Sequence, residues 1–336
     1  MIPLPSDRAA AAAAARQSQL TKPPGALGRL EEVAQLLASL QDRASPRCES
    51  ARVLIAAADH GVAGHGVSAY PSTVTAQMCL NFCAGGAAVN VLARQAGAEV
   101  VVLDVGVAAE LPVRPGLIAA KIAFGTADFT AAPAMSMGQL RQALAAGAAA
   151  IGSSDVLVLG EMGIGNTTSA AALLAAATGL PADSVCGRGT GIDAAGLARK
   201  QAVVAAGLTR HQAVLADPHG CLAALGGFEI AALAGAALAA AERRMPVVVD
   251  GFIATAAALS AVRIDAAVRP YLIFAHRSAE AGHRHALEHL AARPLLELDL
   301  RLGEGTGGVL ALHLLRAACR TLAEMATFAE AGVAAS

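Results

Sequence analysis

Five short apolar runs, none interrupted by a polar residue, are separated by longer, alanine-rich stretches. The runs are residues 53–56, 100–103, 156–159, 247–249 and 272–275. Because each run is continuous and does not alternate with polar residues, we expect each strand to be covered on both faces. Such strands, separated by helical segments, are typical of parallel sheets. The sequence therefore predicts an α/β fold: an open, mostly parallel, Rossmann-like sheet with helices on both faces.

The stretches before, between and after these runs are predicted to be helical. Ser6 is a suitable N-cap for a first helix, which the Pro23-Pro24-Gly25 segment ends. A second helix follows, because leucines and a valine recur at helical spacing over residues 27–40. The other predicted helices cover residues 72–95, 136–151, 167–177, 193–208, 228–243, 279–291 and 306–326.

The order of these elements predicts two domains. Two helices precede the sheet and one follows it, so the two chain ends can pack together. We expect a small helical domain made of residues 1–50 and 305–336. Residues 51–304 then form a large α/β catalytic domain.

Composition excludes several classes of protein. With 55% hydrophobic and 15% charged residues among 336, the chain is not disordered. A net charge of -1 and 3% aromatics argue against a nucleic-acid partner. No membrane span is predicted, because residues 162–182 contain polar groups and the apolar run 230–241 is too short. The N-terminus lacks the pattern of a signal peptide, so we expect a soluble, cytoplasmic protein.

Neither cysteines nor histidines form a convincing metal or disulfide pattern. The six cysteines are scattered, which does not suit a disulfide framework. His283, His285 and His289 fall on one predicted helix without a second ligand group, so a solvated helix face is the favoured interpretation.

Polar residues follow each apolar run at the point where a strand would end. They are Asp59-His60, Asp104, Glu161, Asp250 and His276-Arg277-Ser278. In open parallel sheets, ligands bind outside the carboxyl ends of the strands. A single Asp-Gly pair is more simply a turn or helix cap, but the whole set predicts a small-molecule site.

Three glycine-rich loops carry the candidate chemistry. Residues 160–168 lead from a strand into a helix and could bind an anion, yet match neither a Walker A loop nor a dinucleotide fingerprint. Residues 187–193 precede a helix carrying Lys200, which could contact a phosphate or lie on a solvated face. In residues 303–308, Glu304 stands alone among glycines and is either a general base of raised pKa or a first-turn helix residue.

Together these loops resemble one family, the nicotinate-nucleotide–dimethylbenzimidazole phosphoribosyltransferases of the cobalamin lower-ligand pathway. The matching segments are residues 22–31, 58–62, 74–78, 81–90, 160–168, 187–193 and 303–307. The resemblance implies that nicotinate mononucleotide and 5,6-dimethylbenzimidazole give α-ribazole 5′-phosphate and nicotinate. It also implies a homodimer without metal or other cofactor.

The resemblance also implies roles for individual residues. Glu304 is expected to be the general base, and Glu161 to stabilise positive charge on the ribose or orient the base. The phosphate is expected on backbone N–H groups of residues 163–167, with Lys200 adding charge. The residues expected to bind the nucleotide are Gly163, Ile164, Gly165, Asn166, Thr167, Gly189, Thr190, Lys200, Asp250 and Arg301. The apolar slot for the base is expected near Tyr70, Gln77, Met78 and Leu302.

Three alternatives stay open at this point. The same chemistry could act on another lower-ligand base, such as adenine or a phenol. A non-catalytic nucleotide or base sensor is disfavoured, because a binding protein does not need the lone Glu304 together with Glu161. A dinucleotide oxidoreductase is less favoured still, because the fingerprint is missing.

Overall fold

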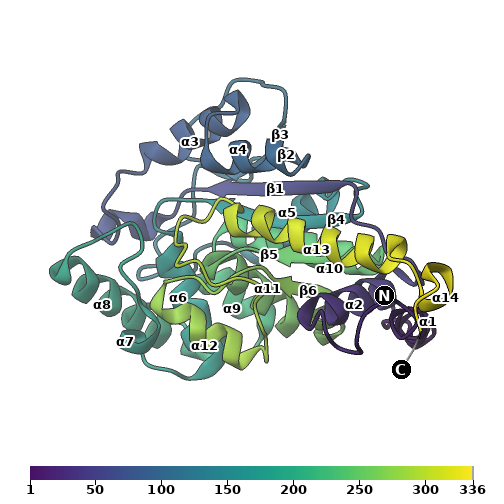
Figure 1. The fold of residues 1–336 in the computed structure, drawn as a ribbon. Coiled ribbons are helices and arrows are strands. Elements are labelled where there is room, and N and C mark those ends of the chain that lie inside the picture. The colour runs from purple at the N-terminus through teal and green to yellow at the C-terminus, as the bar shows by residue number, and fades with distance from the viewer. Residues whose placement is uncertain (335–336) are drawn as a thin grey trace.

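The computed structural model describes residues 1–334, which contain a six-stranded sheet in the order β3-β2-β1-β4-β5-β6. Each neighbouring pair of strands is parallel. Figure 1 shows the sheet crossing the molecule with helices on either side. The strands are β1 (Ala51–Ala58), β2 (Glu99–Gly106), β3 (Leu117–Ala119), β4 (Val156–Met162), β5 (Val247–Val249) and β6 (Leu272–Phe274).

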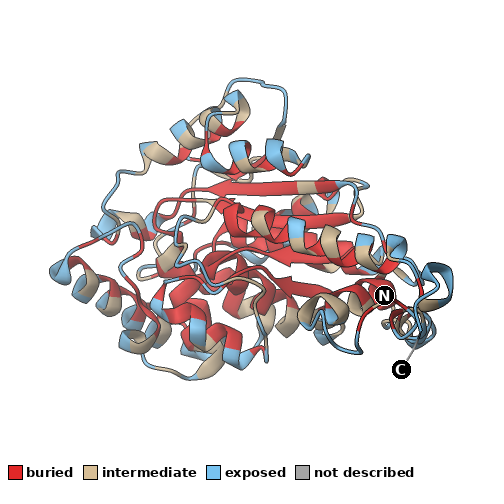
Figure 2. Cartoon of the chain, in the orientation of Figure 1, coloured by how far each residue is buried: buried red, intermediate tan, exposed pale blue. Residues whose placement is uncertain are grey.

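Both faces of the sheet are apolar and covered. In β1, Leu54 and Ala56 belong to one core, whereas Val53 and Ile55 belong to the core on the opposite face. Successive side chains of a strand point to opposite faces, so two covered faces require an unbroken apolar run. Figure 2 shows the strands as buried throughout most of their length.

Two sets of helices supply these cores. The first core contains side chains from α5 (Met137–Ala150), α6 (Asn166–Thr178), α8 (Ala194–Arg210), α9 (Pro218–Leu225), α10 (Phe228–Glu242), α11 (Phe252–Ile264) and α12 (Ala281–His289). The second contains side chains from α1 (Asp7–Gln17), α2 (Arg29–Gln41), α3 (Thr73–Ala84), α4 (Ala88–Gln95) and α13 (Thr306–Glu324). Two four-residue helices are α7 (Ala182–Val185) and α14 (Phe328–Ala331).

The predicted fold class is confirmed, with corrections to individual elements. All five apolar runs form strands, although Ala275 lies just beyond β6, and β3 is a sixth strand that the sequence pattern did not reveal. The single helix predicted over residues 72–95 is wrong, because Gly85 takes a φ of 78° and ends α3. Helix α11 was also not predicted, because it is apolar on all sides and shows no helical periodicity.

The stretch that forms α3 and α4 is apolar over most of its length. Residues 73–95 are long and apolar enough to cross a membrane by length and composition alone. In the structure this stretch consists of two helices separated at Gly85, and both contact β2.

The two ends of the chain meet at one end of the molecule, as Figure 1 shows. Leu20 and Thr327 form an antiparallel bridge, and the Arg16 Nε donates to the carbonyl of Leu322 at 2.7 Å. Helix α2 contacts both α1 and α13. Helices α2 and α13 also pack into the second core of the sheet, and the division into two domains stays a prediction.

Candidate active site

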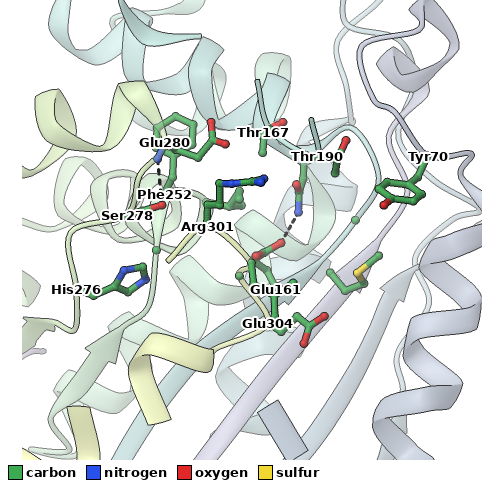
Figure 3. A pocket seen from close by; sticks show the side chains of 18 residues that line it. Tyr70, Glu161, Thr167, Thr190, Phe252, His276, Ser278, Glu280, Arg301 and Glu304 are labelled. Carbon is green, nitrogen blue, oxygen red and sulfur yellow. Dashed lines mark hydrogen bonds between the residues drawn. The ribbon is translucent and has the colours of Figure 1, made fainter. Parts of the chain in front are cut away.

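A cavity of about 340 Å³ opens where β4, β5 and β6 end, within the size range of small-molecule sites. Figure 3 shows side chains converging on it from several strand ends and loops. The structure brings ten of the predicted site residues together in its lining: Tyr70, Glu161, Gly163, Asn166, Thr167, Gly189, Thr190, Arg301, Leu302 and Glu304.

Glu161 and Glu304 come from elements far apart in the sequence. Glu161 is the second-last residue of β4, and Glu304 precedes α13. Glu304 has a φ of 65° between two glycines that also have positive φ, so three consecutive residues adopt the left-handed conformation. A Cβ on Gly160 would lie 2.5 Å from the Glu304 carbonyl oxygen. Glycine at that position lets the loop lie directly against β4, which brings Glu304 into the same part of the cavity lining as Glu161 in Figure 3.

Burial sets the protonation behaviour of both carboxyl groups. Burial, and then the nearby Asp250, raise the pKa of Glu304 to about 7. Its Oε2 is buried and has no hydrogen-bond partner. Burial raises the pKa of Glu161 to about 8, although Asn166 donates a hydrogen bond to its Oε2. The site therefore contains carboxyl groups that exchange protons near neutral pH, as a general base requires.

Asp250 lies behind Glu304 rather than in the lining of the cavity. Its Oδ2 accepts from the N–H of Gly305 at 3.1 Å, and its Oδ1 accepts from the N–H of Gly308 at 2.9 Å. These contacts hold the first turn of α13, whose N–H groups lack partners within the helix. Asp250 thus holds the start of α13, and its expected place beside the nucleotide stays a prediction.

Lys200 is fully buried on α8, so the alternative of a solvated helix face is wrong. Its Nζ donates to Thr167 Oγ1 at 2.8 Å and to the carbonyl of Gly187 at 3.1 Å. Burial lowers the pKa of Lys200, while the Glu280 carboxylate opposes that shift. The ammonium group therefore lies directly behind the cavity wall that Thr167 forms.

The loop between β4 and α6 offers fewer free N–H groups than predicted. The N–H of Ile164 donates to Thr75 Oγ1 at 3.1 Å, and that of Asn166 donates to the Gly163 carbonyl at 3.1 Å. Neither Ile164 nor Gly165 lines the cavity. The structure therefore does not support phosphate contacts by the N–H groups of Ile164 and Asn166.

The two residues predicted on α3 for the base also lie outside the lining. Gln77 is exposed, and Met78 is half-buried against the second core. Met162, which was not predicted, lines the cavity instead. Tyr70, Met162 and Leu302 thus offer apolar surface to a flat base, and the lining also contains Phe252 and Ile253.

Asp59 and His60 directly follow β1 and do not line the cavity. They contact residues that support its lining. Asp59 Oδ1 accepts from the Thr75 hydroxyl at 2.7 Å, and Thr75 in turn binds the N–H of Ile164. The buried His60 ring contacts Glu229 at 2.7 Å. These residues fix the loop between β4 and α6 without reaching the cavity.

The roles assigned to individual residues left out a whole wall of the cavity, although His276 and Ser278 belong to the strand-end set that predicted a small-molecule site. The residues are Met162, Gly251, Phe252, Ile253, His276, Ser278, Glu280 and Gly303. Most of them follow β5 or β6, so their position after a strand was the available signal. Which of these side chains face the cavity depends on loop geometry that no local pattern encodes.

The histidines of α12 do not behave as one solvated group. His283 is fully buried, His285 is half-buried and His289 is exposed. Within residues 1–334, no three histidine, cysteine, aspartate or glutamate side chains are grouped as metal ligands. The His283 ring instead accepts from the N–H of Ser278 at 2.8 Å.

Comparison with known proteins identifies the class to which this fold and site belong. A family profile described as "Phosphoribosyltransferase" matches residues 2–333. The chain is therefore an enzyme of the phosphoribosyltransferase type, that is, a glycosyltransferase.

More specific relatives narrow this class. Nicotinate-nucleotide–dimethylbenzimidazole phosphoribosyltransferase of Chloroflexus aurantiacus is 56% identical over 97% of this chain and 95% of its own length. The protein of that name from Azotobacter vinelandii is 54% identical over 98% and 96%. The crystal structure of CobT from Thermus thermophilus superimposes with a TM-score of 0.94 at 51% identity, covering 98% of this chain and all of that one (100%). The chain belongs to the nicotinate-nucleotide–dimethylbenzimidazole phosphoribosyltransferase family.

Proposed function

We propose that this chain transfers the phosphoribosyl group of nicotinate mononucleotide to 5,6-dimethylbenzimidazole. One ring nitrogen of the base attacks the anomeric carbon, and the bond from that carbon to the pyridinium nitrogen breaks. The bonding pair goes to the departing nicotinate ring, which becomes neutral without a proton. The products are α-ribazole 5′-phosphate, with inverted anomeric configuration, and nicotinate.

The observation that carries this proposal is the buried carboxyl group of Glu304 in the cavity, whose Oε2 has no hydrogen-bond partner. The attacking base must lose the proton on its second ring nitrogen, or the product keeps a positive charge. A carboxylate with a pKa of about 7 accepts that proton efficiently near neutral pH. Because the leaving group needs no acid, one base suffices, in contrast to hydrolytic glycosidases, which use an acid and a base.

Glu161 is proposed to stabilise the ribosyl group as positive charge develops at the anomeric carbon. Asn166 holds one of its oxygens, and the other, Oε1, lies at Gly303, beside Glu304. A developing cation lowers the pKa of a neighbouring carboxyl group. The bound nucleotide already carries a positive pyridinium ring, so Glu161 releases its proton to solvent as the nucleotide binds, and the carboxylate is ionised before the transition state forms.

The 5′-phosphate is proposed to lie at the N-terminus of α6. There the helix dipole favours an anion. Thr167 and Thr190 supply hydroxyl groups, and Lys200 and Arg301 supply positive charge. The base is proposed to lie at the opposite end of the cavity, against the apolar residues Tyr70, Met162 and Leu302.

Two finer features complete the proposal. The enzyme acts as a homodimer, which light scattering would detect as twice the monomer mass. It works in the cytoplasm, where its six free cysteines would remain reduced.

The test is product analysis of purified protein mixed with nicotinate mononucleotide and 5,6-dimethylbenzimidazole. Chromatography and mass spectrometry should show nicotinate and α-ribazole 5′-phosphate in equal amounts. Adenine and a phenol, tested in parallel, reveal whether another lower-ligand base is preferred. If folded protein released no nicotinate with any base, the catalytic proposal would be wrong and a nucleotide or base sensor would replace it.

A further inference from the structure

Glu280 lines the cavity but has no part in the mechanism above. It is the N-cap residue of α12, and only 8% of its surface is exposed. Its Oε2 is buried without any hydrogen-bond partner. Leaving a buried carboxylate oxygen unpaired is costly. Glu280 lines the cavity and its carboxyl group points into it in Figure 3, so a bound ligand can donate a hydrogen bond to this carboxylate.

The surrounding loop holds Glu280 in place. The N–H of Glu280 donates to Ser278 Oγ at 3.3 Å, and the N–H of Ser278 donates to His283 Nδ1 at 2.8 Å. The other ring nitrogen of His283 contacts Thr255 Oγ1 at 2.9 Å. Burial lowers the pKa of His283 to about 3, so this ring stays neutral and keeps one hydrogen-bonding arrangement. Glu280 is therefore fixed before a ligand binds, which favours specific recognition.

Glu280 lies near the end of the cavity where the phosphate is proposed to bind. A Cβ added to Gly187 would clash with Glu280 Oε2, so these two residues are in direct contact. Lys200 Nζ binds the carbonyl of the same Gly187. Glu280 thus lies next to the proposed phosphate site, whereas Tyr70 and Leu302 lie at the base end in the proposed arrangement.

A bound nucleotide has few hydrogen-bond donors that could reach a carboxylate at the phosphate end of the cavity. A phosphate offers acceptors and negative charge, and the ring N–H of the incoming base is assigned to Glu304. The hydroxyl groups of the ribose are the remaining donors. We propose that Glu280 accepts hydrogen bonds from the ribose 2′- or 3′-hydroxyl, so that it selects ribonucleotides over deoxyribonucleotides. This inference rests on the proposed function, because it takes nicotinate mononucleotide as the ligand.

The test combines two kinds of substrate with two proteins. Wild type and Glu280→Gln are compared for kcat/KM with nicotinate mononucleotide and with its 2′-deoxy and 3′-deoxy analogues. We expect the wild type to disfavour at least one analogue by about 10- to 100-fold, the effect of one lost hydrogen bond to a charged group. Glu280→Gln should lose most of this discrimination. Relative to wild type, its kcat/KM should fall with nicotinate mononucleotide but change little with the deoxy analogue that the wild type disfavours. Glu288→Gln is the matched control, since Glu288 is an exposed carboxylate on the same helix.

The outcomes separate this inference from its alternatives. An equal loss of activity with all three nucleotides would overturn it and show that Glu280 acts through the charge of Lys200. Equal use of all three nucleotides by the wild type would also overturn it, and that measurement does not depend on how the variant folds. Absence of turnover with the ribonucleotide itself would instead refute the proposed function on which the inference rests.

Discussion

The proposed transfer reaction depends most directly on one residue, Glu304, because its carboxyl group is the proposed general base. Glu304→Gln keeps the size of the side chain but removes the base. We expect kcat to fall by about 10²- to 10⁴-fold, the usual contribution of a general base. The KM for nicotinate mononucleotide should change little, because the carboxylate acts in the transition state. Steady-state kinetics measure both.

Glu110→Gln controls for the loss of an arbitrary carboxylate, since Glu110 is exposed and does not line the cavity. A Glu304→Gln enzyme with nearly wild-type kcat would show that another group removes the proton.

Lys200 is expected to act in binding rather than in chemistry. Lys200→Met removes the charge behind Thr167 while keeping an unbranched, apolar side chain in the buried space. We expect the KM for the nucleotide to rise by about 10- to 100-fold, as for loss of a charge-assisted contact, with a smaller effect on kcat. Titration calorimetry with the nucleotide alone gives the affinity directly. An unchanged affinity in a folded variant would contradict a phosphate role for Lys200.

At the level of single residues, the sequence predicted which residues meet at the cavity better than it predicted their individual contacts. Glu161 and Glu304 stood out because carboxylates flanked by glycines at strand ends have few structural explanations. Asp250 shared that pattern, yet its carboxylate faces backbone N–H groups of α13 instead of the cavity. Glu280 was not predicted from the sequence. Its Oε2 becomes buried only when the loop after β6 contacts the loop before α8, and no local pattern shows that contact.

At the level of elements, the N-terminus of α13 decides where Glu304 lies. Asp250 accepts from two N–H groups of this helix start, those of Gly305 and Gly308. In Asp250→Asn, the amide cannot accept equally well at both positions, so the first turn should shift. We expect kcat to fall by about tenfold or more with little change in nucleotide affinity, because a small misplacement of a reacting group is costly.

A structural role alone would lower stability without this split between kcat and affinity. Thermal unfolding of Asp250→Asn, measured beside the kinetics, therefore distinguishes the two. Equal losses in kcat and in nucleotide affinity would show that Asp250 contributes to binding instead.

Secondary structure could be predicted where burial and periodicity agreed. The five apolar runs became strands because both faces of the sheet are covered. Strand β3 escaped prediction because it has three residues, which are only partly buried at the sheet edge. The division between α3 and α4 depends on the left-handed conformation of Gly85, and a glycine near a helix end does not by itself show that the chain turns there.

At the level of the whole molecule, residues from both chain ends share a core with the sheet. Leu37 of α2 and Leu312 of α13 belong to the same apolar core as Val53 of β1. The helix that begins next to Glu304 in the cavity ends where Arg16 binds the carbonyl of Leu322. Packing of the chain ends and placement of Glu304 are therefore parts of one arrangement, which a sequence pattern could suggest only as a shared domain.

The site also affects the stability of the whole chain, in a way that depends on pH. Burial raises the pKa of Glu304 from 4.5 to about 7, so the folded state holds this proton more tightly than the unfolded state. Below pH 4.5 both states are protonated and Glu304 imposes no penalty. As the pH rises from 4.5 to 7, the unfolded chain ionises first and the free energy of unfolding decreases. The loss reaches up to about 3 kcal/mol and is constant above pH 7.

Glu304→Gln removes this penalty because glutamine does not titrate. We expect the variant to unfold at a temperature several degrees higher than wild type at pH 8, and at nearly the same temperature at pH 4.5. Thermal denaturation of both proteins across this range, with Glu110→Gln as control, measures the difference. A difference that does not vary with pH would mean that Glu304 has the same pKa, near 4.5, in the folded and the unfolded chain. In that case the carboxylate would be too weak a base at neutral pH for the mechanism proposed, so the stability curve tests the catalytic assignment without any substrate.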